Sequence, residues 1–196
     1  EKIFEYKLEN ISDYFLVDKR IESEKGKRKV ESEKTLRIAL LSSFTSKGIK
    51  EVLNVKCCSL GILPEFYLGG YNQYAQEILD DKSALYEFSP ELTIVFIDII
   101  NLFGDAFFFP YRFSDDQRRS LIDEKYNTLT VLIETLSKRH AGKVIAHNFN
   151  VPAYSPLGIL EQKQDFGIAE AVRTLNSKLR ERYKDDSRVY IFDYDL

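Results

Sequence analysis

Five short apolar runs recur along the chain, and segments with helical periodicity separate them. The runs are LRIALL (36–41), PEFYLGG (64–70), ELTIVFIDI (91–99), KVIAHNF (143–149) and RVYIFDY (188–194). Most are continuous and rich in β-branched residues, as strands buried on both faces require. The pattern therefore predicts five strands that alternate with helices.

The intervening segments carry helix signals. Residues 48–61 predict a helix that Gly61 ends, and residues 73–87 predict a single helix. Ser114 and Gln117 form a capping box that opens a long helix, which Gly142 stops. Apolar residues at steps of three and four mark its buried stripe and a later helix: Ile122, Tyr126, Leu129, Ile133, Leu136, then Ile168, Val172, Leu175 and Leu179. Alternating strands and helices predict an α/β fold, a doubly wound five-stranded parallel sheet with helices on both faces. The favoured order is the flavodoxin-like 2-1-3-4-5.

The first 34 residues differ from the rest. Phe4, Leu8, Ile11 and Phe15 predict a short amphipathic helix over residues 1–17. Residues 18–34 are mostly charged and mixed in sign, which favours a solvated helix extension or a flexible linker. We expect residues 1–34 to precede an α/β domain at 35–196, and the lack of methionine suggests a fragment of a longer protein.

Composition limits the classes of binding partner and the cellular compartment that we expect. A net charge of −3 argues against nucleic-acid binding, which usually needs a basic patch. No apolar run approaches the ~20 residues of a membrane span, and the charged N-terminus does not resemble a signal peptide. The two cysteines, Cys57 and Cys58, are adjacent and suit a reducing compartment. We expect a cytoplasmic protein with no nucleic-acid or membrane partner and no metal site of its own; composition does not define the oligomeric state.

Polar residues follow each predicted strand at the same end. They are Ser42, Ser43, Thr45; Gly69, Gly70, Asn72; Asp98, Asn101; His147, Asn148; Asp193 and Asp195. Carboxyl ends of parallel strands open a shared crevice, where α/β proteins bind ligands. Strand ends also become polar simply where they meet solvent, so this edge is a candidate site only.

Ser43 could be a nucleophile, with backbone N–H groups of Ser43 and Gly70 and the Asn101 side chain as an oxyanion hole. The alternative is a serine that caps the following helix. His147 is the candidate base, yet a strand separates it from Ser43, about 10 Å at ~4.8 Å per strand. A structurally satisfied histidine is its alternative. The other histidine, His140, lies at a helix C-terminus and suits the helix dipole.

Residues 104–113, GDAFFFPYRF, are dense in aromatic side chains and follow the third predicted strand. They could form a lid or a partner-binding surface at the site. They could equally be a loop that packs its own aromatics onto the domain.

The segment Leu41–Thr45 resembles the first block of SGNH/GDSL hydrolases, a Gly-Asp-Ser-x-Thr-like sequence after the first strand. Ser43 falls on the nucleophile, and Ser42 replaces the Asp of that block. Gly70 or Gly69 would be the oxyanion glycine of the second block. The last block, Asp-x-x-His, is absent before residue 196.

The third block of those hydrolases, Gly-x-Asn-Asp, is echoed only by Asp98-Ile-Ile-Asn101. Asp98 stands where the family has glycine, so Asn101 would reach the oxyanion only after a slip of one residue. These departures weigh against an active esterase.

A second resemblance is more specific. The chain is similar to the N-terminal, SGNH-like domain of FkbH-like proteins of the HAD superfamily, through LRIALLSSFT, the stretch from FYLGGYNQYA to TIVFID, HNFNVPAYSPLGILE and VYIFDYD. The resemblance implies a HAD domain downstream with a DxDxT motif and its magnesium. The whole protein would move a glyceryl unit from 1,3-bisphosphoglycerate to an acyl carrier protein for polyketide assembly. We interpret Asp193 and Asp195 as the edge of strand five, not as a HAD nucleophile pair, so no cofactor is expected in this chain.

Three hypotheses remain. In the first, this domain binds an acyl carrier protein or an acyl or phosphate small molecule around Gly70, Asn72, Asp98, Asn101 and Asn148. In the second, it is a serine esterase or acyltransferase with Ser43 as nucleophile. In the third, it is a non-catalytic scaffold.

Overall fold

A computed structural model describes residues 8–25 and 34–195. Five strands form one sheet, in which every pair of neighbours is parallel and the order is β2-β1-β3-β4-β5. The strands are β1 Lys34–Ser42, β2 Ile62–Leu68, β3 Leu92–Phe96, β4 Lys143–His147 and β5 Val189–Phe192. The predicted parallel sheet and its strand order are confirmed.

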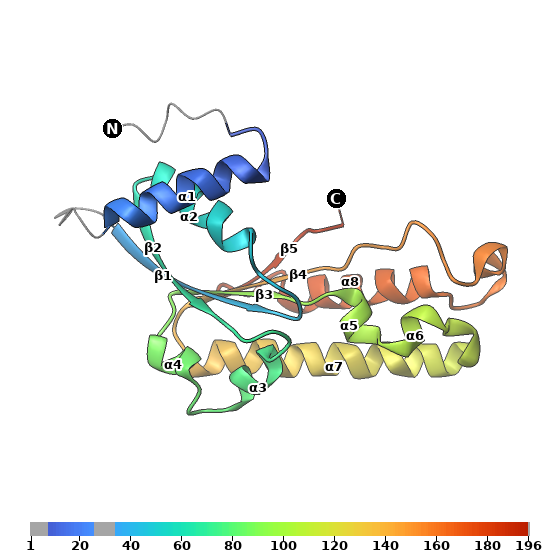
Figure 1. The fold of residues 1–196 in the computed structure, drawn as a ribbon. Helices are drawn as coiled ribbons and strands as arrows, with labels where there is room; N and C mark the ends of the chain where they lie inside the picture. Colours follow the sequence, from blue (N-terminus) through green and yellow to red (C-terminus); the bar gives the residue numbers. More distant parts are fainter. Residues whose placement is uncertain (1–7, 26–33, 196) are drawn as a thin grey trace.

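Helices lie on both sides of the sheet (Figure 1). Those after β1 are α2 Ile49–Ser59, α3 Tyr74–Leu79, α4 Ala84–Phe88, α5 Ile99–Phe103, α6 Asp105–Phe108, α7 Asp115–Arg139 and α8 Ile168–Tyr183; the described residues also include the 3-10 helices η2 Pro110–Arg112 and η3 Gly158–Lys163. The larger core lies between the sheet and helices α7 and α8, where Leu41, Leu136 and Val172 are fully enclosed. The predicted stripes of both helices face it.

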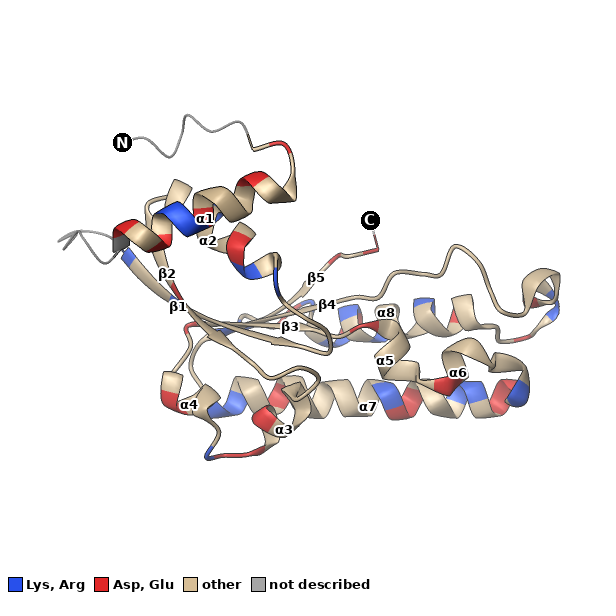
Figure 2. Cartoon of the chain, in the orientation of Figure 1, with Lys and Arg blue, Asp and Glu red and all other residues tan. Residues whose placement is uncertain are grey.

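The opposite face of the sheet carries a smaller core. Ile38, Leu40 and Ile94 pack there against Leu53 and Cys57 of α2. Helix α1, Ile11–Lys25, lies on the outer side of α2 (Figure 1). Residues of both charge signs are spread along α1 and α7 (Figure 2), and the net charge of the chain is −3.

The N-terminal helix differs from its prediction. It begins at Ile11 and runs to Lys25, while Phe4 and residues 26–33 lie outside the described residues. Val17 and Ile21 are buried against Val55 of α2. The charged segment was expected to be solvated, but Asp18 is only 7% exposed.

Polar contacts explain the burial of Asp18. Its carboxylate accepts a hydrogen bond from Asn54 Nδ2 at 2.5 Å and pairs with Lys50 at 3.2 Å. Asn54 is itself fully buried and also donates to Glu22 at 2.9 Å. A buried charge is tolerated only when it is paired and hydrogen-bonded, and here both conditions are met. The first part of the charged run is therefore a packed helix.

The predicted helix at 73–87 is two short helices. The first ends at Leu79, and Asp80 has extended backbone angles. The Ser83 hydroxyl then accepts a hydrogen bond from Leu85 N–H at 3.2 Å and caps α4. Asp and Ser compete with helical hydrogen bonds through their side chains, which breaks the periodic segment here.

The N-terminal end of α7 follows the sequence closely. Ser114 and Gln117 form the predicted capping box, with hydrogen bonds of 3.2 and 2.8 Å. The C-terminal end differs from its prediction, because the helix ends at Arg139 and His140 is already extended, before Gly142 is reached. Gly142 instead allows a close approach, since a Cβ there would lie 2.5 Å from the Pro90 carbonyl oxygen. Within the described residues, no helix combines the length and the apolar character needed to cross a bilayer.

Candidate functional site

Ser43 lies at the end of β1 and is completely buried. Its N–H donates to the Phe96 carbonyl at 2.9 Å, so the ladder with β3 continues beyond the strand. Its hydroxyl oxygen accepts the Asp98 N–H at 2.8 Å. In this conformation the hydroxyl joins two segments of backbone and is shielded from solvent.

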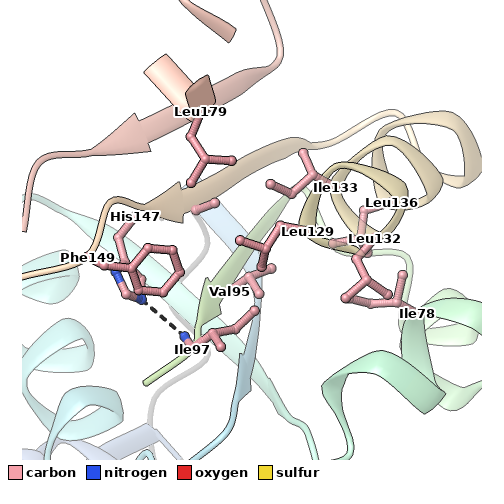
Figure 3. A pocket seen from close by; sticks show the side chains of 11 residues that line it. Ile78, Val95, Ile97, Leu129, Leu132, Ile133, Leu136, His147, Phe149 and Leu179 are labelled. Atoms are coloured by element: carbon pink, nitrogen blue, oxygen red, sulfur yellow. Dashed lines mark hydrogen bonds between the residues drawn. The ribbon is translucent and has the colours of Figure 1, made fainter. Parts of the chain in front are cut away.

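His147, at the end of β4, is satisfied at both ring nitrogens. Nε2 accepts the Ile97 N–H at 3.0 Å, the dashed line in Figure 3, and Nδ1 donates to the Asn148 carbonyl at 2.5 Å. These bonds require the neutral ring with its proton on Nδ1. Burial lowers the pKa of His147, against smaller opposing effects of Asn148 and Asp98. The imidazole is therefore held neutral.

Ser43 and His147 hydrogen-bond to neighbouring backbone N–H groups and not to each other. They approach the chain that leaves β3 from its two sides, and they bind the successive N–H groups of Asp98 and Ile97. The strand order places β3 between their strands, as the sequence predicts. Their roles as nucleophile and base stay predictions. The satisfied histidine describes the contacts of His147. The helix-capping alternative for Ser43 is wrong, because the N-cap of α2 is Gly48 and the Ser43 hydroxyl accepts the Asp98 N–H instead.

The proposed oxyanion donors are also engaged. Gly70 N–H donates to Glu77 Oε1 at 2.7 Å, as Ser43 N–H does to β3. Asp98 caps α5, since Oδ1 accepts the N–H groups of Ile100 and Asn101 at 2.7 and 3.3 Å. Asn101 is exposed on the first turn of that helix. The structure thus shows no assembled oxyanion hole among these groups.

Two glycines bring the end of β2 close to its neighbours. A Cβ at Gly69 would lie 2.8 Å from Leu41 Cδ2, and one at Gly70 would lie 2.2 Å from Gln73 Oε1. Glu77 also accepts the Tyr67 hydroxyl at 2.7 Å. Burial, and then the adjacent Glu77 carboxylate, raises the pKa of Tyr67 to about 12.

Asn72 and Asn148 occupy structural positions in the edge. Asn72 adopts a left-handed conformation with φ 55°, and its N–H donates to the Ser42 carbonyl at 3.2 Å. Asn148 Nδ2 donates to Asp193 at 2.6 Å, while its Oδ1 accepts the N–H groups of Tyr194 and Asp195 at 2.6 and 3.2 Å. Asn148 therefore holds the end of β4 to the segment after β5.

An open cleft of about 360 Å³ lies beside these residues, where β1 and β2 end. Its lining is Phe44, Thr45, Ser46, Lys47, Lys50, Glu51, Leu68, Gly69 and Tyr71. Sequence reasoning named two of these lining residues, Thr45 and Gly69, among the residues that follow the strands, but it missed the others. A sequence signal for the cleft is the mostly polar loop over residues 44–48, which must leave the plane of the sheet to connect β1 with α2.

A second cavity is internal and apolar. It lies between the sheet and α7, where Val95, Leu129 and Leu132 surround a space of about 10 Å³ (Figure 3). That volume is about one water molecule. It is too small for an organic ligand, so this cavity is a packing defect of the larger core.

The aromatic segment 104–113 is fixed by Arg118, which is 4% exposed. The guanidinium donates to the carbonyls of Pro110 and Phe113, to Phe166 O at 2.6 Å, and to Asp115 and Gln164. Phe107 is buried, as expected of a segment that packs its own aromatics onto the domain, but the segment forms α6 and η2 where a loop was expected. Phe108 and Tyr111 are 49% and 61% exposed, so part of the segment also faces solvent.

Among residues 8–25 and 34–195, no three or more Asp, Glu, His or Cys side chains are grouped so that they could hold a metal ion. Asp193 and Asp195 instead accept hydrogen bonds from Asn148 and from Val151 N–H, at 2.6 and 2.7 Å.

The strand order and the cleft at the carboxyl edge define an open-sheet α/β domain. The family model of the FkbH N-terminal domain matches residues 37–196, and the chain therefore belongs to this family. It is similar in fold to the N-terminal part of protein BF1531 from Bacteroides fragilis, described as containing a phosphatase domain complexed with Mg. The TM-score is 0.73 at 20% identity, over 91% of this chain and 45% of that one, so this chain spans less than half of its length. No curated protein matches the chain.

Proposed function

We propose that this domain serves a FkbH-like protein that loads a glyceryl unit from 1,3-bisphosphoglycerate onto an acyl carrier protein. In that protein, the cleft at the ends of β1 and β2 would bind the acyl or phosphopantetheine end of the partner. The observation that carries the proposal is the cleft itself, whose volume of about 360 Å³ lies in the usual range of ligand sites.

The cleft lining suits an extended ligand with both amide and phosphate groups. Phe44, Leu68 and Tyr71 offer apolar contact, and Tyr71 is 70% exposed. Lys47 brings positive charge to the loop before α2, while Lys50 in the first turn pairs with Asp18 at 3.2 Å and with Glu22 at 3.7 Å. A phosphate at that end would gain from Lys47 and the helix dipole, while the apolar wall would hold the arm.

The glyceryl chemistry itself is assigned to a magnesium-dependent HAD domain beyond residue 196. The family membership and the greater length of the similar solved chain support this division. Sequencing the encoded protein downstream tests it directly. A DxDxT motif supports the assignment, and its absence from the complete protein overturns it.

Binding at the cleft can be measured by NMR titration of the chain with coenzyme A and with a holo acyl carrier protein. We expect amide shifts at residues 44–51 and 68–71. Tyr71→Ala should weaken them several-fold. Tyr154→Ala is the matched control, since Tyr154 is 79% exposed and lies outside the cleft. No shifts at the cleft with either ligand would overturn the proposal and favour a scaffold domain.

The serine esterase is the alternative, and a fluorophosphonate probe separates it. Because Ser43 is buried and its hydroxyl accepts the Asp98 N–H, we expect no labelling of the folded chain. Labelling of the wild-type chain but not of Ser43→Ala would establish a reactive serine, and would require the Ser43 contacts to open.

A further inference from the structure

One face of the sheet is covered only in part. Helix α2 packs over β1 and β3, with α1 outside it, and no helix in the described part of the chain lies over β4 and β5 on that side (Figure 1). On β5, Val189 points to the core of α8 and is 2% exposed. Tyr190 and Phe192 alternate with it and are 50% and 55% exposed. Parallel sheets are normally covered on both faces, so the part of the chain that the structure describes leaves this half of the sheet without one of its two covering layers.

Tyr194 extends the exposed surface beyond the strand. It is 58% exposed, and its ring lies 5.4 Å from the His147 ring, which lies 5.8 Å from Phe96. We call Tyr190, Phe192 and Tyr194 the β5 strip. Half of three aromatic side chains amounts to roughly 300 Å² of surface, a size that is often functional in a single-domain protein.

The β5 strip is held in place. Tyr194 N–H donates to Asn148 Oδ1 at 2.6 Å, and Asp195 Oδ1 accepts the Val151 N–H at 2.7 Å. Lys143 lies over the Tyr190 ring at 5.7 Å from its centroid. The strip is thus a preorganised surface, and a partner would bind it without paying to order it.

We propose that the β5 strip docks the phosphatase-type domain that follows residue 196 in the longer protein. The inference rests on the two-domain organisation of the proposed function. This chain spans 45% of a similar solved chain whose description names a phosphatase domain. Asp195 is fixed beside the strip, so a following domain would be tethered within a few residues of it. Short tethers give effective concentrations near the millimolar range, which makes a modest apolar patch sufficient.

Hydrogen exchange tests the docking, with the longer protein compared against the 196-residue chain. We expect amides 189–195 to exchange more slowly in the longer protein, on the order of tenfold, the usual scale of coupling between sites. The double variant Tyr190→Thr/Phe192→Thr should abolish that difference, because threonine keeps the strand propensity and removes the aromatic surface. Equal exchange of wild type in both forms would overturn the proposal.

A matched control is the pair Tyr154→Thr/Ile159→Thr, whose side chains are 79% and 90% exposed, in the loop after β4 and in η3 respectively. It should leave the exchange difference intact. Exchange that slows with the concentration of the 196-residue chain alone would assign the strip to a second copy, and would also overturn the proposal. The coenzyme A titration uses the cleft and not the strip, so failure of the docking leaves the proposed binding function unaffected.

Discussion

Ser43→Ala separates a structural serine from a catalytic one. The substitution removes the acceptor of the Asp98 N–H, which donates to Ser43 Oγ at 2.8 Å in a site where Ser43 has no exposed surface. A buried donor left without a partner costs about 1–3 kcal/mol, and one deleted oxygen leaves little room for water to replace it. We therefore expect the free energy of unfolding to fall by about 2 kcal/mol.

For a chain of this size, a loss of about 2 kcal/mol lowers the melting temperature by roughly 4–8 °C. Urea unfolding, followed by circular dichroism, gives the free energy, and calorimetry gives the melting temperature. Ser46→Ala is the matched control, because Ser46 lies in the next turn at the cleft. If the free energy of unfolding of Ser43→Ala stays within about 0.5 kcal/mol of wild type, the hydroxyl does not stabilise the strand ends as described. That result would instead favour a catalytic serine, because replacing a catalytic residue often leaves stability unchanged or raises it.

Three further predictions concern other contacts. Arg118→Lys keeps the charge but loses most of the carbonyl contacts, so calorimetry should show a loss of about 3 kcal/mol; a wild-type melting temperature would contradict it. Gly142→Ala places a Cβ 2.5 Å from the Pro90 carbonyl, so urea unfolding should show a loss of about 2–3 kcal/mol, whereas a loss below 0.5 would mean that the 90–91 backbone yields freely. Burial lowers the pKa of His147 and of His140, so below pH ~6.5 the unfolded chain binds more protons than the folded chain, and the free energy of unfolding decreases as the pH is lowered. Urea unfolding at several pH values should show a weaker pH dependence for His147→Phe than for wild type, and an unchanged pH dependence would refute the contribution of His147.

Much of the fold could be predicted because it rests on long, strongly patterned segments. The buried runs at β1 and β3 and the stripe of α7 define layers, and right-handed crossovers leave few strand orders. Prediction failed where side-chain chemistry decided the local structure. Ser83 starts a new helix inside a periodic segment, and Asp18 becomes buried through Asn54, a partner from a distant helix.

The sequence predicts which edge of the sheet carries the candidate residues, but it does not predict their contacts. Residue types at the carboxyl edge were correctly placed, because they depend only on strand ends. Whether Ser43 and His147 meet depends on which backbone groups lie between them, and the N–H groups of Ile97 and Asp98 fill that space. Neither those bonds nor the cleft volume leaves a signature in residue order.

The two bonds at Ile97 and Asp98 have a mechanical consequence. Each peptide unit is planar and rigid, so the direction of the chain at Ile97 depends on two torsions. His147 restrains the unit before that residue, and Ser43 restrains the unit after it. The orientation of α5, which begins two residues later, is therefore determined by side chains at the ends of β4 and β1. Protonating the imidazole would remove the acceptor of the Ile97 N–H. Acid would therefore free this peptide unit and displace the first residues of α5, although no group within the helix itself is titrated.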